Sequence, residues 1–205
     1  MKCSALRTSL SGLAVLLLIN GCATEPELSD PSVHSVEFSV KNRLPCFAPK
    51  NDSTLSQSVA RIHTVSVMQN VDSNADDSSM WMVRWQDPVR LAQGECIQYG
   101  ADTGRKPYVY PLENCTDPRL KPVLGGYKLL ASGECVGDDE AKRLEKGVTY
   151  FVSMEAQADD SAESEGHYIR DFFCMTDGRN GETAVRRLKY NTDKDSVETC
   201  PSIRR

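Results

Sequence analysis

The cysteines constrain this chain more than any other feature of its sequence. There are 8 cysteines in 205 residues. Cys3 and Cys22 lie near the N-terminus, before and just after a short apolar run that is considered below, so six remain for the folded part. These six are well separated, and no C-x-x-C pair or Cys/His cluster indicates a zinc or thioredoxin-like redox site. We therefore expect three disulfides, formed in an oxidising compartment, and no metal.

Six cysteines can pair in many ways, and their spacing alone does not select one pairing. We favour bonds between cysteines that are neighbours in the sequence, because two of the resulting bonds would close local loops. Each bond would stabilise the fold by about 2–4 kcal/mol. The favoured pairs are Cys46 with Cys96, Cys115 with Cys135, and Cys174 with Cys200.

The N-terminal segment has the layout of an export signal. Lys2 and Arg7 precede an apolar run at residues 13–19 that is too short to span a bilayer as a stable helix. Residues 19–22, Ile-Asn-Gly-Cys, then resemble a bacterial lipobox. That resemblance implies cleavage just before Cys22, thioether lipidation of Cys22 and acylation of the new N-terminus, typically with palmitate.

The predicted location and domain boundaries follow from this signal. Ala23 stands where an aspartate would favour retention in the inner membrane of many Gram-negative bacteria. We therefore predict a periplasmic lipoprotein anchored to the outer membrane. The expected parts are a signal peptide at residues 1–21, a lipidated flexible tether at 22–33, and a β-rich periplasmic domain at 34–205, folded as one unit or as two small β modules.

The charge of the chain argues against nucleic acid as a partner. The leader holds two of the 24 basic residues and none of the 29 acidic residues, so the chain without it has a net charge of −7. Binding to phosphates depends on lysine and arginine, which are here in the minority. A modest negative charge mildly favours a basic protein partner, although it also serves simply to keep an exported protein in solution.

Hydrophobic alternation with a period of two predicts strands along most of the domain. An acidic loop at residues 72–79 would join two of these strands, and a turn at 177–181 would join strands at 168–174 and 183–190 into a hairpin. A short helix is predicted at 138–146, which begins with acidic residues and ends with basic ones. We expect a mainly β fold, an antiparallel β-sandwich-like domain with short helical elements, stapled by disulfides. The clearest alternating segments are residues 36–40, 63–67, 81–85 and 148–154.

One short sequence occurs twice. Residues 91–97, LAQGECI, and residues 130–136, LASGECV, differ only conservatively or at one polar position. The sequences around them do not match well. The repeat therefore indicates either a duplication or a turn-and-strand device used twice.

No motif in the chain indicates catalysis. There is no G-x-S-x-G, H-E-x-x-H, phosphate loop or dinucleotide fingerprint. His34, His63 and His167 are far apart in the sequence, each in or beside a predicted strand, where an imidazole is more often structural or solvated than catalytic. We expect a protein that is not an enzyme, with no catalytic residues and no cofactor.

Two further patterns suggest ligand sites but fit structural roles better. Asp72, Asn74 and Asp76 have the spacing that opens a calcium loop, but Asp77 replaces the required glycine and Val83 the required glutamate. An exposed loop is the better interpretation. Five aromatic residues could form a carbohydrate-binding face, although such a stripe is more often part of a core. They are Trp81, Trp85, Tyr99, Tyr108 and Tyr110.

Three fragments and the lipobox together resemble a known family. The fragments are Cys46-Phe47, the pattern L-x-x-G-E-C-I-x-Y-G at residues 91–100, and the pattern L-x-x-G-x-x-Y-x-V-x-M at 144–154. In this order they look like the type VI secretion system immunity periplasmic lipoproteins of enterobacteria. The resemblance covers roughly residues 1–155, and the segment 105–135 and the C-terminal hairpin depart from it. It implies a lipid-anchored, β-rich periplasmic domain that binds and neutralises a toxin delivered by a neighbouring cell.

An inhibitor of this kind would use exposed loops to bind its toxin. We expect the acidic loops to approach a basic toxin surface, so that charge reversal there would slow association at low salt. A structural or assembly lipoprotein that binds another outer-membrane component is the alternative, and an envelope hydrolase with an unrecognised site is a third hypothesis. The residues expected at the interface are Asp72, Asp76, Asp77, Asp159, Asp160, Glu163 and Glu165.

Overall fold

Alternating burial along the strands produces a mainly antiparallel β fold. In β9 (Thr149–Ala158), Tyr150, Val152, Met154 and Ala156 are buried, and the residues between them are more exposed. A sheet with one face on a core requires this period of two. The prediction of a mainly β fold with three disulfides is confirmed. The computed structural model describes residues 35–50, 60–69, 79–116, 127–137, 140–158, 167–178, 180–194 and 196–201.

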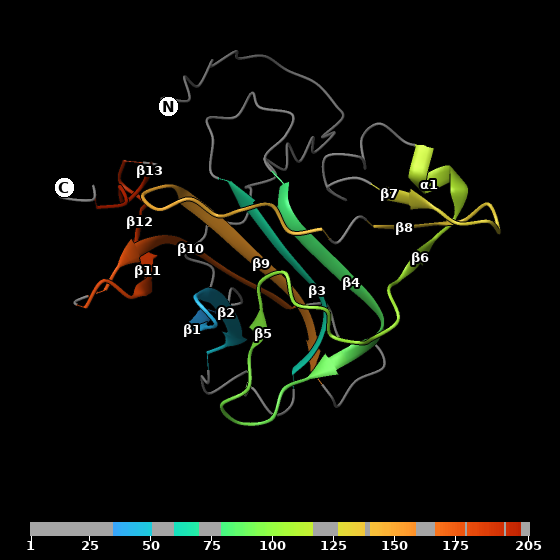
Figure 1. Cartoon of the computed structure of the whole chain (residues 1–205), viewed down its shortest axis with the longest axis horizontal. Coiled ribbons are helices and arrows are strands. Elements are labelled where there is room, and N and C mark those ends of the chain that lie inside the picture. The colour runs from blue at the N-terminus through green and yellow to red at the C-terminus, as the bar shows by residue number, and fades with distance from the viewer. Residues whose placement is uncertain are drawn as a thin grey trace, which may run out of the picture. The chain divides into compact units, whose positions relative to one another are not determined.

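The largest sheet has five strands, and every neighbouring pair in it is antiparallel (Figure 1). The predicted hairpin after residue 167 is present. The two strands expected on either side of residues 72–79 are β3 and β4, and they pair directly with each other. Register shifts between Ile62 and Thr64 interrupt the pairing of β3 with both β9 and β4. In spatial order the strands are β11 (Thr183–Leu188), β10 (His167–Asp177), β9, β3 (Ala60–Gln69) and β4 (Ser79–Arg90).

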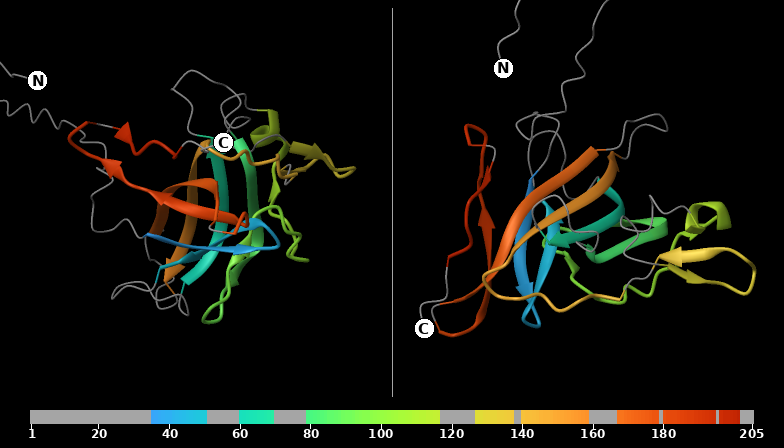
Figure 2. Two further views of the ribbon diagram at one scale, coloured as in Figure 1. Left: turned by 60° about the vertical axis from the view of Figure 1, so that its left-hand side comes forward. Right: turned by 90° about the horizontal axis from the view of Figure 1, so that it is seen from above.

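A second sheet packs on the inner face of the first. It contains β1 (Val36–Lys41), β2 (Leu44–Pro49) and β5 (Ile97–Gln98). The ring of Phe173 on β10 lies 5.5 Å from the rings of both Phe38 and Phe47, centroid to centroid. All three rings belong to one hydrophobic core that both sheets share, so the two sheets form the layers of a sandwich-like arrangement (Figure 2).

Asp171 connects the two layers by polar contacts at the edge of this core. Its Oδ2 accepts a hydrogen bond of 3.2 Å from the backbone N–H of Val36 and lies 2.9 Å from Nη2 of Arg187. Arg187 also donates to the backbone carbonyl of Val36. Burial raises the pKa of Asp171 above its ordinary value, and the guanidinium of Arg187 only partly opposes that rise.

This raised pKa predicts how Asp171 affects stability. The folded chain binds the proton more tightly than the unfolded chain, so the contribution of Asp171 is present at low pH and is lost as pH rises through its raised pKa. In Asp171→Asn the side chain no longer titrates. The unfolding free energy of the wild-type chain, minus that of the variant, should therefore fall between about pH 3 and neutrality. Urea unfolding of both chains across this pH range would measure the difference in unfolding free energy. If that difference rose with pH, the ion pair with Arg187 would affect the pKa of Asp171 more than burial does.

A small third sheet lies beside β4. Its strands are β6 (Val109–Tyr110), β8 (Cys135–Gly137) and β7 (Tyr127–Leu129), and helix α1 (Leu112–Thr116) follows β6. Tyr110, Cys115 and Cys135 form its core, against which Met82 of β4 packs. In both views of Figure 2 this part of the chain stands out at one side of the five-stranded sheet.

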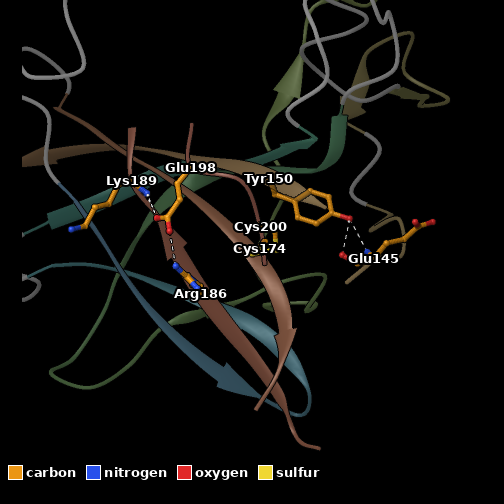
Figure 3. The surroundings of a disulfide bond; sticks show 7 residues. All are labelled: Glu145, Tyr150, Cys174, Arg186, Lys189, Glu198 and Cys200. Carbon is orange, nitrogen blue, oxygen red and sulfur yellow. Dashed lines mark hydrogen bonds and ion pairs between the residues drawn. A yellow bond between two sulfur atoms is a disulfide. The ribbon is translucent and has the colours of Figure 1, made fainter. Parts of the chain in front are cut away.

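The C-terminal segment folds back on the outer edge of the large sheet. β12 (Tyr190–Asn191) pairs with β13 (Ser196–Val197), and Glu198 accepts hydrogen bonds from Arg186 at 2.5 Å and from the backbone N–H of Lys189 at 3.3 Å (Figure 3). Together with Leu188, the two cysteines of the last disulfide form a small separate core. The segment is thus fixed both covalently and by packing.

The three disulfides are those that the sequence favoured. Each bond holds a different part of the fold: the second sheet, the small third sheet and the C-terminal segment. The pairs are Cys46–Cys96, Cys115–Cys135 and Cys174–Cys200, with Cα–Cα distances of 5.5, 6.3 and 6.0 Å.

The repeated sequence forms a tight turn in both places. Gly94 and Gly133 have φ values of 80° and 87°, which only glycine adopts without strain. Each turn places the next cysteine for its disulfide, Cys96 before β5 and Cys135 at the start of β8. The strands that follow belong to different sheets. The repeat therefore works as a turn-and-strand device used twice.

The prediction of a helix at residues 138–146 is wrong for its described part. Residues 140–145 have no regular secondary structure, and Lys146 forms a parallel bridge to Met175. Ala141 and Leu144 pack against the main core, and the backbone of Lys142 bonds to distant residues. These contacts outweigh the favourable charge pattern for a helix, which is worth only about 1 kcal/mol or less.

Candidate functional site

A pocket of about 440 Å³ lies beside residues 140–146, which we call the strap. Its wall combines the strap with the loop between β1 and β2, the turn after β5, and the facing ends of β10 and β11. The lining residues are Arg43, Leu44, Tyr99, Gly100, Ala141, Lys142, Arg143, Leu144, Lys146, Met175 and Thr183.

Hydrogen bonds from the core hold the strap in place. The backbone N–H of Lys142 donates to the carbonyl of Met80 at 2.9 Å, and the hydroxyl of Tyr99 donates to the carbonyl of Lys142 at 2.7 Å. Further along, the backbone N–H of Glu145 donates to the hydroxyl of Tyr150 at 2.7 Å, as Figure 3 shows. Buried phenols thus replace the backbone partners that a helix would supply.

Tyr99 is buried, and its hydroxyl contacts the backbone of both β4 and the strap. Its hydroxyl lies 3.0 Å from the carbonyl of Met80 and 2.7 Å from that of Lys142, so both oxygens share its single hydrogen. Burial raises the pKa of Tyr99, and the nearby Tyr150 raises it further, which keeps the phenol protonated. The ring of Tyr99 packs edge-on against Trp81 at 5.3 Å. This hydroxyl is therefore committed to structure.

Close packing also sets the position of the strap. Gly100 has a φ of 66°, and a Cβ at this position would lie 2.7 Å from the Cβ of Ala141. Real Cβ atoms do not approach this closely, so a side chain at Gly100 would displace the strap. Only glycine allows both this backbone conformation and this contact.

The pocket is strongly basic in a chain that is acidic overall. Four of its lining residues are cationic and none is acidic, although the chain has a net charge of −5. Lys146 forms an ion pair with Asp177, which is not a lining residue. Arg43 and Arg143 are exposed and form no ion pair or hydrogen bond with any residue that the structure describes. These two guanidinium groups are available to an anion.

Arg43 occupies a position that would suit glycine better. The loop between β1 and β2 has two residues, Asn42 and Arg43, with φ values of 53° and 65°. Two-residue hairpin loops of this kind usually carry Asn-Gly, because glycine adopts positive φ without a steric cost. The arginine costs about 1–2 kcal/mol of backbone strain. Strain of this kind tends to occur at functional sites.

The structure does not bring the other sequence-predicted candidates together as a site. Cys22, His34 and the seven acidic residues expected at an interface lie outside the described residues. His63 on β3 bonds to Gln157 at 3.1 Å, and His167 lies on β10, with β9 between these strands. The aromatic residues are mainly core: Trp81, Trp85, Tyr99 and Tyr110 are buried, and Tyr108 is half-buried.

Sequence reasoning missed the basic pocket. Lys142, Arg143 and Lys146 form a basic cluster in the sequence, but the charge pattern predicts that they end a helix. Arg43 was visible as part of a turn, and nothing in the sequence placed that turn next to the strap. A basic cluster within an acidic chain, and an arginine at the glycine position of a hairpin loop, were the available signals.

These features define a class: a disulfide-linked, mainly β domain of an extracytoplasmic protein, with a basic pocket on its surface. In the part of the chain that is described, no helix has the length and apolar character needed to cross a membrane. No protein-family model, curated protein or solved structure matches the chain.

Proposed function

We propose that this protein is a lipid-anchored periplasmic binding protein that neutralises a toxin delivered by a neighbouring cell. The observation that carries the proposal is the basic pocket. Among its described lining residues there is no histidine, cysteine, serine or carboxylate, and the hydroxyl of Tyr99 is committed to backbone carbonyls. Such a pocket suits the binding of a charged partner group better than chemical turnover.

The surrounding scaffold supports this function. A non-catalytic inhibitor binds more tightly when its surface is ordered before it meets the partner, because less conformational entropy is lost on binding. Here the strap is held by Tyr99 and Tyr150, and disulfides hold the elements around it. Tyr99, Gly100 and Leu144, which belong to the fragments that resemble the immunity lipoproteins, line the pocket.

The location is part of the proposal. The residues that resemble a lipobox, 19–22, would attach Cys22 to lipid, and Ala23 favours the outer membrane. A toxin that enters the periplasm would then meet an inhibitor held at the membrane surface.

Survival of cells that export the product of the adjacent gene to the periplasm tests the function. We expect growth to stop in cells without this protein and to be restored when its exported form is present. A form without residues 1–21 stays in the cytoplasm and is the matched control, because it has the same domain in the wrong compartment. Toxicity that the exported form does not relieve would contradict the proposal and favour the alternative of an envelope assembly lipoprotein.

A further inference from the structure

We propose that the basic pocket binds the carboxylate groups of an acidic peptide segment, held between Arg43 and Arg143. The inference rests on the proposed function, because such a segment would belong to the protein partner. The two arginines come from separate elements, the β1–β2 loop and the strap, and both line the same pocket. A segment lying in the pocket would contact both.

The chemistry of the wall favours carboxylates on a peptide. A guanidinium group presents a planar fork of donors that matches a carboxylate with two parallel hydrogen bonds. Between the cations the wall is apolar, with Leu44, Leu144 and Met175. This arrangement suits glutamate side chains, whose methylene groups contact apolar surface while their carboxylates reach the rim. An inorganic anion would leave the apolar part of the wall uncovered.

The size of the pocket agrees with such an occupant. A volume of about 440 Å³ lies in the range of pockets that bind small ligands, roughly 300–1,000 Å³. It holds a few side chains and is too small for a folded element. Lys142 and Lys146 add positive charge at the same opening. The pocket therefore fits a short extended segment.

The backbone strain at Arg43 supports the same inference and does not depend on the charge or volume of the pocket. Glycine would adopt the positive φ at this position without strain. The loop instead has an arginine, whose side chain is exposed and has no partner among the described residues. Within the part of the chain that the structure describes, no ion pair or hydrogen bond of that guanidinium stabilises the fold. A role in binding explains why a destabilising residue stands there.

The test is a direct titration of the full chain in a nonionic detergent. Fluorescein-labelled hexaglutamate, with both ends blocked, is the probe, and its fluorescence anisotropy reports binding. We expect saturable binding of hexaglutamate and none of labelled hexaglutamine, which has the same length without charge. Arg43→Gly and Arg143→Gln should each weaken binding by roughly tenfold or more, since each removes a charged hydrogen-bonding partner.

Matched variants separate this effect from general changes in charge or folding. Arg105→Gln removes an exposed cation that does not line the pocket, and Asn42→Gly changes the same loop without removing a cation. Both should bind hexaglutamate as the wild-type chain does. Arg43→Gly should also raise the thermal unfolding midpoint by about 2–4 °C, because it relieves strain. Weaker binding in a more stable protein cannot result from misfolding.

Several results would overturn the assignment. Equal binding of hexaglutamate and hexaglutamine, or equal losses in Arg105→Gln and Arg143→Gln, would show that the pocket does not recognise carboxylates. Displacement of the probe by citrate at lower concentration than by unlabelled hexaglutamate would assign the pocket to a small free acid. Toxin neutralisation by a variant that lacks both Arg43 and Arg143 would leave the proposed function intact and remove the pocket from it. If the wild-type chain binds hexaglutamate but does not neutralise the toxin, the pocket keeps its carboxylate specificity and the proposed function is wrong.

Discussion

Replacement of Phe173 by alanine should lower the free energy of unfolding by about 3–5 kcal/mol, the usual cost of deleting a fully buried phenyl ring. Phe173 has no exposed surface and lies where the two main sheets meet. Its ring is 5.5 Å from the rings of Phe38, Phe47 and Tyr150, so the cavity left behind would remove contacts from both layers at once. Urea or thermal unfolding would measure the loss.

The neighbouring Phe172 provides the matched control. It lies on the opposite face of β10, is only half-buried, and packs against Phe151 at 5.0 Å and Tyr190 at 6.1 Å. The same substitution, Phe172→Ala, should cost about half as much or less, because fewer contacts and less buried area are lost. If Phe172→Ala lowered the free energy of unfolding as much as Phe173→Ala or more, the main core would not lie between the two sheets.

Removal of the Cys46–Cys96 disulfide should have the second large effect. The bond closes the longest loop of the three, with a sequence separation of 50 against 20 for Cys115–Cys135. If cross-links act by restricting the unfolded chain, the paired change to alanine should cost about 4 kcal/mol at the longer loop and about 3 kcal/mol at the shorter one. Chemical unfolding of the two double variants under non-reducing conditions would compare them.

This comparison also tests the structural role of the first disulfide. Cys96 precedes β5, which leads directly to Tyr99 and Gly100 at the pocket. Loss of the Cys46–Cys96 bond should therefore weaken hexaglutamate binding as well, whereas loss of Cys115–Cys135 in the small third sheet should not. A larger loss of stability from Cys115–Cys135 would contradict the argument from loop length.

The alternation of apolar residues predicted the sheets well, because burial on one side of a strand imposes a period of two that is visible in the sequence. It predicted the strands that became β3, β4, β9 and β10 and the hairpin after residue 167. The even number of cysteines predicted the disulfides, and their order along the chain favoured the pairing found. The strap was predicted incorrectly, because its charges suit a helix end while its hydrogen-bond partners lie in distant segments.

By itself, the sequence determined the mainly β class of the fold and the presence of three disulfides, since the first depends on local pattern and the second on the chemistry of a single residue type; it favoured the disulfide pairs but did not select them. Only the tertiary structure decided where the basic pocket lies. Arg43 and Arg143 are one hundred residues apart in the chain, and they line one pocket because Tyr99, Gly100 and Tyr150 hold the strap against the core. Contacts between segments so distant in sequence leave no periodic signal, so the pocket forms only when the chain is folded.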